Sequence, residues 1–548
     1  MRPCLLRTLI GLLLILWGGS SGLGWTQASG TAGRVRHIDI VTRNVFSREK
    51  VKGRWLYRFI NALHVPTHEP VVRRRIWFAE GDMVTYEELA ELERNLRAIG
   101  LFAEVSVEAQ PTGQPGEIDV AVLTRDLFSL QLGASGFSVG GVSGFHGSLA
   151  ESNLFGRGDK VGVSAKRNSN GELETLVSYT DLYLFGSPYR MRVAAGTTEE
   201  GPQVQFEFGR PFYHLEDPNS WGVAAAYIEN LYDYYDGGET TAEVPTDVAS
   251  ARAFIAFAEG TRERRRTLGY ELRLEHTNFG VARGPAAPGI DVPGNLDQAT
   301  LASRIGYEWN QSFLKLERLD ALDAVEDVAL GLRVDLLVGG LLRAEENAST
   351  RLEPVLEPNL RAAWMPAEDT YLSLQTTGRV RWFEEQATGW NSTAALHLYQ
   401  QSLPYQTLAL SLVYDQAYEG EDLPIQYNLG EDNGLRGYPA REFAGTRRLR
   451  LNLEDRIFTD VRYRSIRLGI VPFFDMGWIG EDGFGSPKRG VGIGLRFGST
   501  ELFGDRVLRM DFAFPLDQIE GQDFRPSFSI SIDQVFSFFG NSSRLSGN

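Results

Sequence analysis

The residues that could support catalysis are few and poorly placed for it. His64 and His68 lie four apart, as in a helical zinc motif, but Pro66 between them breaks a helix and no acidic third ligand accompanies them. There is no G-x-S-x-G nucleophile motif. The glycine pairs of "RGVGIGLRFG" (489–498) alternate as a strand and open no helix, so they do not indicate a nucleotide site. We expect no catalytic residue, no metal and no cofactor.

Charge pairing is the other chemistry that the residue types allow. The stretch "EDNGLRGYPAREFAG" (431–445) holds Arg436 within one connection that runs from 419 to 445, between two alternating segments. A hairpin turn needs only about two to five residues. Gly434 and Gly437 would let this oversized connection fold back sharply. The pattern therefore predicts a folded-back segment.

An acidic partner is available in "SIRLGIVPFFDMG" (465–477). Its alternation assigns Arg467 and Asp475 to the face opposite the apolar one. Charges on a confined inner face need partners. A solvated loop arginine is the alternative interpretation of Arg436, and spacing alone favours that alternative.

The elements that must position these residues are strands. From Asp126 onward, segments of about ten residues alternate apolar and polar and are separated by turn-rich stretches. This alternation fits a soluble sandwich or a membrane barrel. Polar faces with charges of both signs, aromatics at strand ends and connections of alternating length favour the barrel. We expect an antiparallel transmembrane β-barrel of about 16–20 strands over 126–548.

The lengths of the connections predict the orientation of the barrel. Short turns lie on the periplasmic rim and long loops on the extracellular rim of outer-membrane barrels. We expect long connections at 232–247, 279–299, 342–354 and 419–445, and short ones near 157, at 185–188 and at 366–369, with 313–325 as an exception. The connection that holds Arg436 is therefore expected on the extracellular rim.

Residues 34–125 mix helix and strand signals. The clearest helix is "TYEELAELERNLRAIG" (85–100), in which Thr85 and Glu88 form a capping box and Gly100 suits the C-terminal end. Two strand-like segments follow. We expect a small β-α-α-β-β unit with its own core.

The N-terminus and the net charge bound the location and the partners. Residues 1–28 are typical of a secretory signal, with a positive start, a short apolar run and small residues before a cleavage site. The single cysteine, Cys4, lies in this segment, so we expect neither disulfides nor thiolate chemistry in the mature chain. The net charge of −16 and the lack of a basic stripe argue against a nucleic-acid partner.

Four stretches, taken together and in order, resemble the bacterial surface antigen family. This superfamily contains the BamA and TamA outer-membrane assembly proteins and the two-partner secretion transporters. The similar stretches are "VVRRRIWFAEGDMVTYEELAELERNLRAIGLFAEVSV", "ESNLFGRGDKVGV", "GLRGY" and "FFDMGWIG". The first looks like the second half of a polypeptide-transport-associated (POTRA) domain, which would make 34–125 a periplasmic POTRA domain.

The resemblance also implies a site. The long loop of the family folds into the lumen, where its arginine pairs with an acidic residue on the inner wall. Carried over to this chain, Arg436 in the Arg436-Gly437-Tyr438 motif would pair with Asp475, with Glu454 as a second candidate.

The first and last strands carry the remaining expectation. Insertion factors of the family close the barrel by a weak seam, which here would join 128–139 to 525–536. An unpaired strand edge templates the addition of another strand. The seam residues on which we base this expectation are Gly133, Gly136, Phe528, Ile530 and Ile532. The implied partners are the outer-membrane bilayer, unfolded or partly folded client proteins, and periplasmic accessory proteins that bind the POTRA domain.

Two departures from the family pattern keep alternatives open. The chain has one POTRA-like unit where BamA-type insertases have several, and it runs on past Phe536 instead of ending on an aromatic residue. A narrower translocator fits equally well. The runner-up is a structural or passive pore-forming barrel without assembly activity, and a secreted soluble β-enzyme is a third class.

Overall fold

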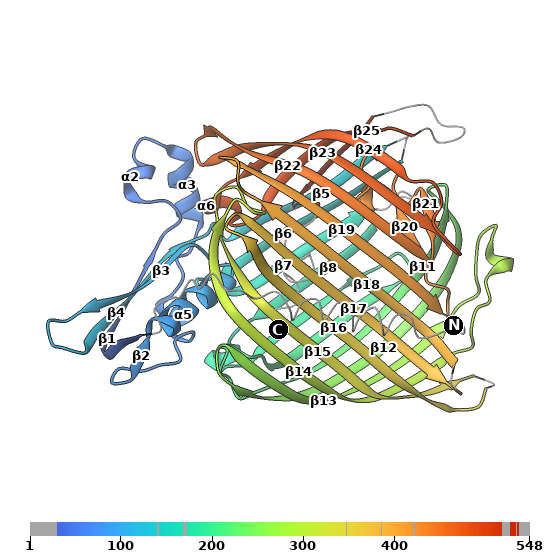
Figure 1. The fold of residues 1–548 in the computed structure, drawn as a ribbon, viewed down its shortest axis with the longest axis horizontal. Coiled ribbons are helices and arrows are strands. Elements are labelled where there is room, and N and C mark those ends of the chain that lie inside the picture. The colour runs from blue at the N-terminus through green and yellow to red at the C-terminus, as the bar shows by residue number, and fades with distance from the viewer. Residues whose placement is uncertain are drawn as a thin grey trace.

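The computed structural model describes residues 30–139, 142–167, 173–346, 348–384, 386–419, 422–517, 526–532 and 534–535. The expected signal segment, 1–28, lies outside them. Within these ranges a small α+β unit sits at one end of a closed β-barrel (Figure 1). None of the helices in this part of the chain is long and apolar enough to cross a membrane. The predicted fold class, an antiparallel barrel preceded by a small α+β unit, is confirmed.

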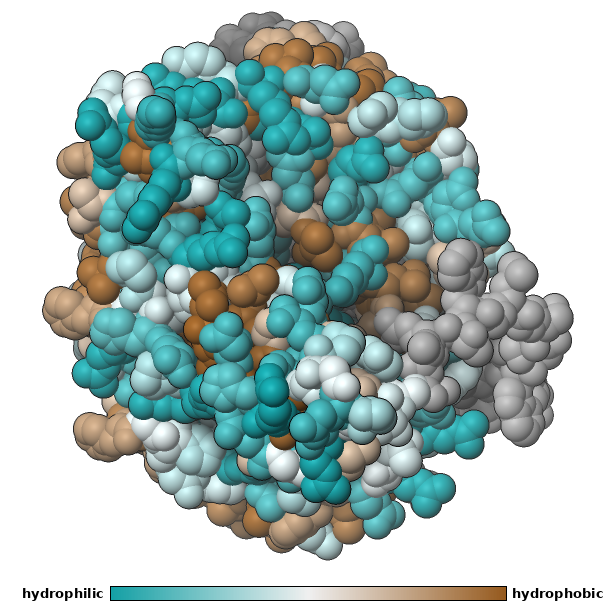
Figure 2. Space-filling view, turned by 90° about the vertical axis from the view of Figure 1, so that its left-hand side faces the viewer, coloured by the Kyte–Doolittle hydropathy of each residue, from teal (hydrophilic) through white to brown (hydrophobic). Residues whose placement is uncertain are grey.

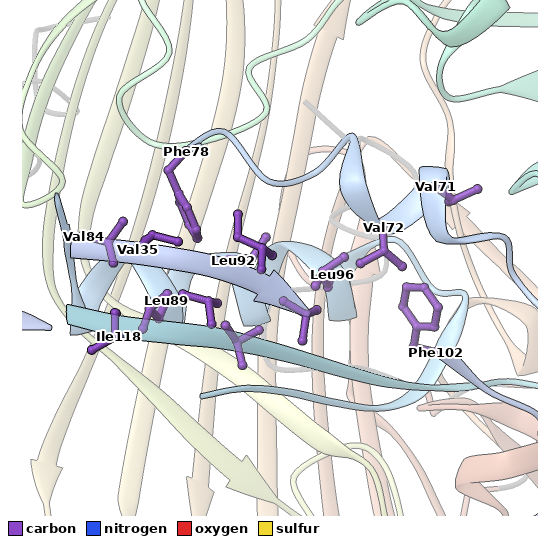
Figure 3. Close-up of a cluster of buried hydrophobic side chains, with 14 of the residues drawn as sticks. Val35, Val71, Val72, Phe78, Val84, Leu89, Leu92, Leu96, Phe102 and Ile118 are labelled. Carbon is purple, nitrogen blue, oxygen red and sulfur yellow. The ribbon is translucent and has the colours of Figure 1, made fainter. Parts of the chain in front are cut away.

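The N-terminal unit is a four-stranded sheet in the order β2-β1-β4-β3, packed against helices. Its elements are β1 (Thr31–Arg43), α2 (Arg48–Val51), α3 (Trp55–Leu63), α4 (Glu69–Arg73), β2 (Met83–Thr85), α5 (Tyr86–Ala98), β3 (Phe102–Pro111) and β4 (Glu117–Asp126). The predicted capping box of Thr85 and Glu88 starts α5. The apolar stripe of this helix, which includes Leu89, Leu92 and Leu96, packs on the sheet and forms the core (Figure 3).

Over the described residues the barrel has 20 strands, each antiparallel to the next, and it closes where the last strand meets the first. These strands are β5 (Leu130–Val139), β6 (Val142–Leu154), β7 (Asp159–Arg167), β8 (Leu173–Asp181), β9 (Arg190–Thr197), β10 (Pro202–Arg210), β11 (Asn219–Asp236), β12 (Glu239–Gly260), β13 (Arg264–Phe279), β14 (Leu296–Glu317), β15 (Val325–Glu345), β16 (Arg351–Ala367), β17 (Thr370–Phe383), β18 (Gln386–Gln400), β19 (Gln406–Glu419), β22 (Arg447–Tyr463), β23 (Ile466–Gly480), β24 (Lys488–Gly498), β25 (Val507–Pro515) and β26 (Ser527–Ile532). The count equals the upper value expected from the sequence.

One predicted loop is a strand hairpin instead. Residues 232–247, expected as a long connection, belong to β11 and β12, which pair from Asn219↔Phe257 out to Asp236↔Glu239. The alternation of apolar and polar residues is weak over 232–247 because this hairpin extends beyond the barrel wall and lies against other loops. It covers the segment 422–445: the backbone N–H of Tyr235 donates to the Gln426 side chain at 2.8 Å. The prediction of a loop at 232–247 was therefore wrong.

Two connections fold into the barrel, one from each end. The long one between β19 and β22 contains β20 (Tyr427–Leu429), the short 3₁₀ helix η3 (Glu431–Asn433) and β21 (Phe443–Gly445). The other is the turn 318–324 between β14 and β15, at the end of the barrel that faces the N-terminal unit; here Leu319 and Leu322 are 1% and 2% exposed. We call these segments the inner loop (422–445) and the inner turn (318–324). Residues 313–325 were expected as an exception to the alternation of short and long connections, but their position inside the barrel was not predicted.

Candidate functional site

Arg436 is the centre of the site, and its side chain is 1% exposed. Its Nε donates to Oδ2 of Asp475 at 2.7 Å, and its Nη2 donates to Oδ1 at 2.8 Å. Such a bidentate pair fixes the orientation of the loop as well as its position. The guanidinium also lies over the ring of Phe473, with Cζ 3.4 Å from the centroid. Positions 473 and 475 face inward together because they are two residues apart in β23.

Two more carboxylates complete the environment of this guanidinium. Nη1 of Arg436 donates to Oε1 of Glu454 at 2.9 Å and to Oδ2 of Asp511 at 3.1 Å. Glu454 belongs to β22 and Asp511 to β25, and both side chains are fully buried. The inner loop is thereby joined to three different strands of the wall through one side chain.

Further arginines balance these carboxylates. Nε of Arg456 donates to Glu454 at 2.9 Å, and Nη1 of Arg496 donates to Asp511 at 2.6 Å. The sequence named Asp475 and Glu454 as candidates but missed Asp511, Arg456 and Arg496. Their inward positions in alternating strands are the signal that could have found them. The structure places all these charges in one buried network across β22 to β25.

Gly437 and Tyr438 hold the loop next to the arginine. Gly437 has φ 98°, and a Cβ there would lie 2.9 Å from the backbone carbon of Phe514, so both the conformation and the close approach require glycine. The side chain of Tyr438 is buried and its hydroxyl donates to the carbonyl of Arg489 at 2.8 Å. The Arg436-Gly437-Tyr438 motif therefore packs against β24 and β25.

The inner loop also reaches the last strand. The backbone N–H of Gly437 donates to Oε2 of Glu431 at 3.0 Å, and the hydroxyl of Ser527 donates to the same oxygen at 3.1 Å. Ser527 is the first residue of β26. A displacement of the inner loop would thus break a direct contact with β26, the strand that closes the barrel.

The inner turn approaches the network from the opposite end. Nη1 of Arg456 donates to the Leu319 carbonyl at 2.7 Å and to Oδ1 of Asp320 at 2.8 Å. The Tyr399 hydroxyl donates to the same Asp320 oxygen at 2.9 Å. The side-chain amide of Gln534, just after β26, donates to the Asp320 carbonyl at 3.0 Å. Arg456 therefore joins the inner loop and the inner turn through Glu454 and Asp320.

The closure of the barrel has a short ladder. Within the described residues, β26 and β5 pair at three positions, Phe528↔Ser138, Ser529↔Phe137 and Ile530↔Gly136. On its other side β26 has six such pairs with β25. Of the predicted seam residues, Phe528, Ile530 and Gly136 lie in the described seam ladder, whereas Gly133 and Ile532 do not. A Cβ on Gly133 would lie 2.1 Å from Oγ of Ser148, so that glycine accommodates β6 and not the seam.

The N-terminal unit docks on the end of the barrel where the inner turn lies (Figure 1). Arg97 of α5 forms a bidentate pair with Asp327 of β15, with both distances 2.7 Å. Nζ of Lys315 donates to Glu93 at 2.6 Å, and Nε of Arg262 donates to Glu91 at 2.7 Å. This end of the molecule is largely hydrophilic (Figure 2). A cavity of about 2720 Å³ extends from α5 to the inner loop.

His64, one of the two histidines considered as metal ligands, has an ordinary structural role. The ring of His64 shares hydrogen bonds with Asp126 at 2.8 Å and Ser129 at 3.1 Å. Within the described ranges, no group of three or more His, Cys, Asp or Glu side chains is placed to hold a metal ion. His64 thus fixes the junction between the N-terminal unit and β5.

Comparison with known proteins finds local sequence relatives, and no protein-family model matches the chain. It is 27% identical over 184 residues to outer envelope protein 80 of the Arabidopsis thaliana chloroplast, which covers 30% of this chain and 25% of the relative. It is 30% identical over 138 residues to the outer membrane protein assembly factor BamA of Nitratidesulfovibrio vulgaris, which covers 24% of this chain and 17% of the relative. The chain thus matches no more than a quarter of the length of these relatives.

Two solved structures align with this chain at low similarity. BamA from Haemophilus ducreyi lacking POTRA domains 1–3 aligns with a TM-score of 0.41 at 13% identity, covering 91% of this chain and 85% of that one. CdiB from Escherichia coli aligns with a TM-score of 0.43 at 12% identity, covering 91% and 77%.

The closed antiparallel barrel with its small N-terminal unit defines an outer-membrane β-barrel protein. The relatives named BamA and outer envelope protein 80 support its location in the outer membrane of a bacterium. Over part of its length the chain is thus similar to members of the BamA/TamA-type superfamily of outer-membrane barrels, which agrees with the resemblance seen in the sequence.

Proposed function

We propose that this protein assembles or translocates other proteins at the outer membrane, without catalysing a chemical reaction. The observation that carries the proposal is the short ladder between β26 and β5, three pairs against six on the other side of β26. A strand edge exposed there would accept a strand of a client protein, because backbone hydrogen bonds are indifferent to sequence.

The inner loop would control this edge. It is anchored to β22, β23 and β25 by Arg436 and to β26 by Glu431. Release of the loop would remove the hydrogen bond to Ser527 and free the seam strand. The N-terminal unit, as a POTRA domain, would receive clients or accessory proteins at the adjoining cavity. Relatives named as assembly factors support this role.

Depletion of the protein from its own cells tests the proposal. The folded amounts of other outer-membrane barrels, measured by heat-modifiable gel migration, and of surface or secreted proteins are expected to fall and to recover when the wild-type chain is supplied. Unchanged amounts of both would contradict the proposal. If the purified barrel then conducted ions across a planar bilayer, the alternative of a passive pore would take its place.

A further inference from the structure

An apolar stripe on α3 is unexplained by the fold. Trp55, Phe59 and Leu63 are spaced four apart, so they share one face of the helix. Their exposed fractions are 66%, 53% and 55%. The opposite face, with Tyr57 and Ile60, is buried in a cluster of the N-terminal unit. A short helix with apolar side chains on both faces needs a second surface to cover the exposed one.

Basic residues border this stripe. Arg54 at the N-cap and Arg58 within the helix lie beside the apolar face, and Arg48, Lys50 and Lys52 precede them; all five are exposed. Lys50 pairs with Glu501 at the barrel rim. Glu49 is the acidic residue within 48–63. Aromatic and apolar side chains flanked by arginine and lysine are the composition of helices that lie in a membrane interface.

The position of α3 brings the stripe to the membrane side of the rim. The segment after the helix is bound to the end of β6 and to the turn between β6 and β7: Nδ2 of Asn153 donates to the Val65 carbonyl at 3.1 Å, and the N–H of His68 donates to the Gly156 carbonyl at 2.8 Å. In the same turn Phe155 is 68% exposed. The outward side chains of β5 to β7 continue the apolar surface, among them Leu130, Leu132, Leu149 and Val163.

We propose that α3 lies in the periplasmic leaflet of the outer membrane, with Trp55, Phe59 and Leu63 among the acyl chains and Arg54 and Arg58 at the lipid phosphates. The occupant of the stripe is phospholipid, because the stripe is continuous with the lipid-facing wall and is bordered by positive charge.

The helix is tied to the seam strand by its C-terminal end. His64 caps α3 and shares buried hydrogen bonds with Asp126 and Ser129, and β5 begins at Leu130. Lipid held by α3 thus lies beside the first strand of the barrel, which makes the helix a fixed membrane contact next to the seam.

Fluorescence quenching tests the placement in the full-length protein. In a Cys4→Ser background, Phe59→Cys carries an environment-sensitive fluorophore, and Gln110→Cys, exposed near the end of β3, is the matched control. Both are reconstituted in vesicles of phosphatidylethanolamine and phosphatidylglycerol with brominated acyl chains. The bromines should quench the label at position 59 several-fold more than at 110, since the apolar face of an interfacial helix is buried about 5–10 Å into the boundary between headgroups and acyl chains.

Equal quenching at the two positions would overturn the proposal. So would a label at position 59 that becomes protected only as the protein-to-lipid ratio rises, because a second copy would then cover the stripe. Arg54→Glu with Arg58→Glu supplies a variant that leaves the apolar residues in place. Quenching at position 59 should fall in this variant while heat-modifiable migration stays unchanged, and undiminished quenching would contradict the role assigned to the two arginines.

Discussion

At the scale of single residues, Arg436 has the strongest predicted effect. Arg436→Ala would leave Asp475, Glu454 and Asp511 buried with one positive partner fewer. Removing one partner of a buried ion pair costs about 3–5 kcal/mol. The free energy of unfolding, measured by urea titration of the purified barrel in detergent, should fall by that amount.

Arg441→Ala in the same loop is the matched control. Arg441 pairs with Asp432, lies over the ring of Tyr235 and is 33% exposed, so its loss should cost about 1 kcal/mol, well below the cost at Arg436. Arg436→Lys should recover only part of the loss, because an ammonium cannot make the bidentate contact with Asp475. Equal stability of Arg436→Ala and Arg441→Ala would show that the loop is not held by this network.

The sequence located part of this network but not its extent. Alternation alone predicted that Asp475 faces inward, and the family resemblance supplied Arg436 as its partner, with Glu454 as the second candidate partner of that arginine. Asp511, Arg456 and Arg496 also stand at inward positions, but the sequence does not show which strands are neighbours across the lumen. Asp320 could not be predicted from the sequence, because it enters the lumen from a turn whose path depends on the packing of Leu319 and Leu322.

At the scale of elements, the alternation of apolar and polar residues predicted which segments are strands, but it predicted the ends of the strands less well. Strand pairing in β11 and β12 continues beyond the membrane, where the outward face no longer needs to be apolar, so 232–247 appeared as a loop. The capping box located the start of α5 because its signal is local. The docking of α5 on the barrel was not predictable, since it depends on long-range pairs such as Arg97 with Asp327.

This docking should weaken in acid. Burial alone would raise the pKa of the Glu93 carboxyl, but hydrogen bonds from Lys315 and Arg97 more than offset burial and leave the pKa below its ordinary value of 4.5. A carboxyl whose pKa is lower in the docked state favours docking above its undocked pKa, and this contribution is lost as the pH falls through the docked pKa. The protection factor of the α5 amides, which is the intrinsic exchange rate at a given pH divided by the observed rate, should therefore be high at pH 7 and fall as the pH drops below the ordinary value of 4.5.

Glu93→Gln isolates this contribution. The variant should show a lower protection factor in α5 at pH 7 and a smaller further loss of protection on acidification. Glu104→Gln serves as the control, because Glu104 pairs with Arg125 within the N-terminal unit and is 60% exposed. The account of docking would fail if wild-type and Glu93→Gln proteins had the same pH dependence.

At the scale of the whole molecule, the inner loop, the inner turn and the seam form one connected system. Arg436 and Glu431 join the loop to β22, β23, β25 and β26, while Asp320 joins the turn to β22. The contacts thus gather on the strands beside the seam. A protein that only formed a passive pore would not need its last strand to be tied to an in-folded loop.

A disulfide across the seam tests the central claim most directly. In a Cys4→Ser background, Ile530→Cys with Gly136→Cys links β26 to β5, and Ile530→Cys with Met510→Cys links β26 to β25 as the control. Facing residues in antiparallel strands are close enough for such a bond. In cells that depend on the variant, the seam disulfide should stop assembly or translocation of client proteins until a reductant is added, and the control disulfide should not. Full activity with an oxidised seam would contradict the account.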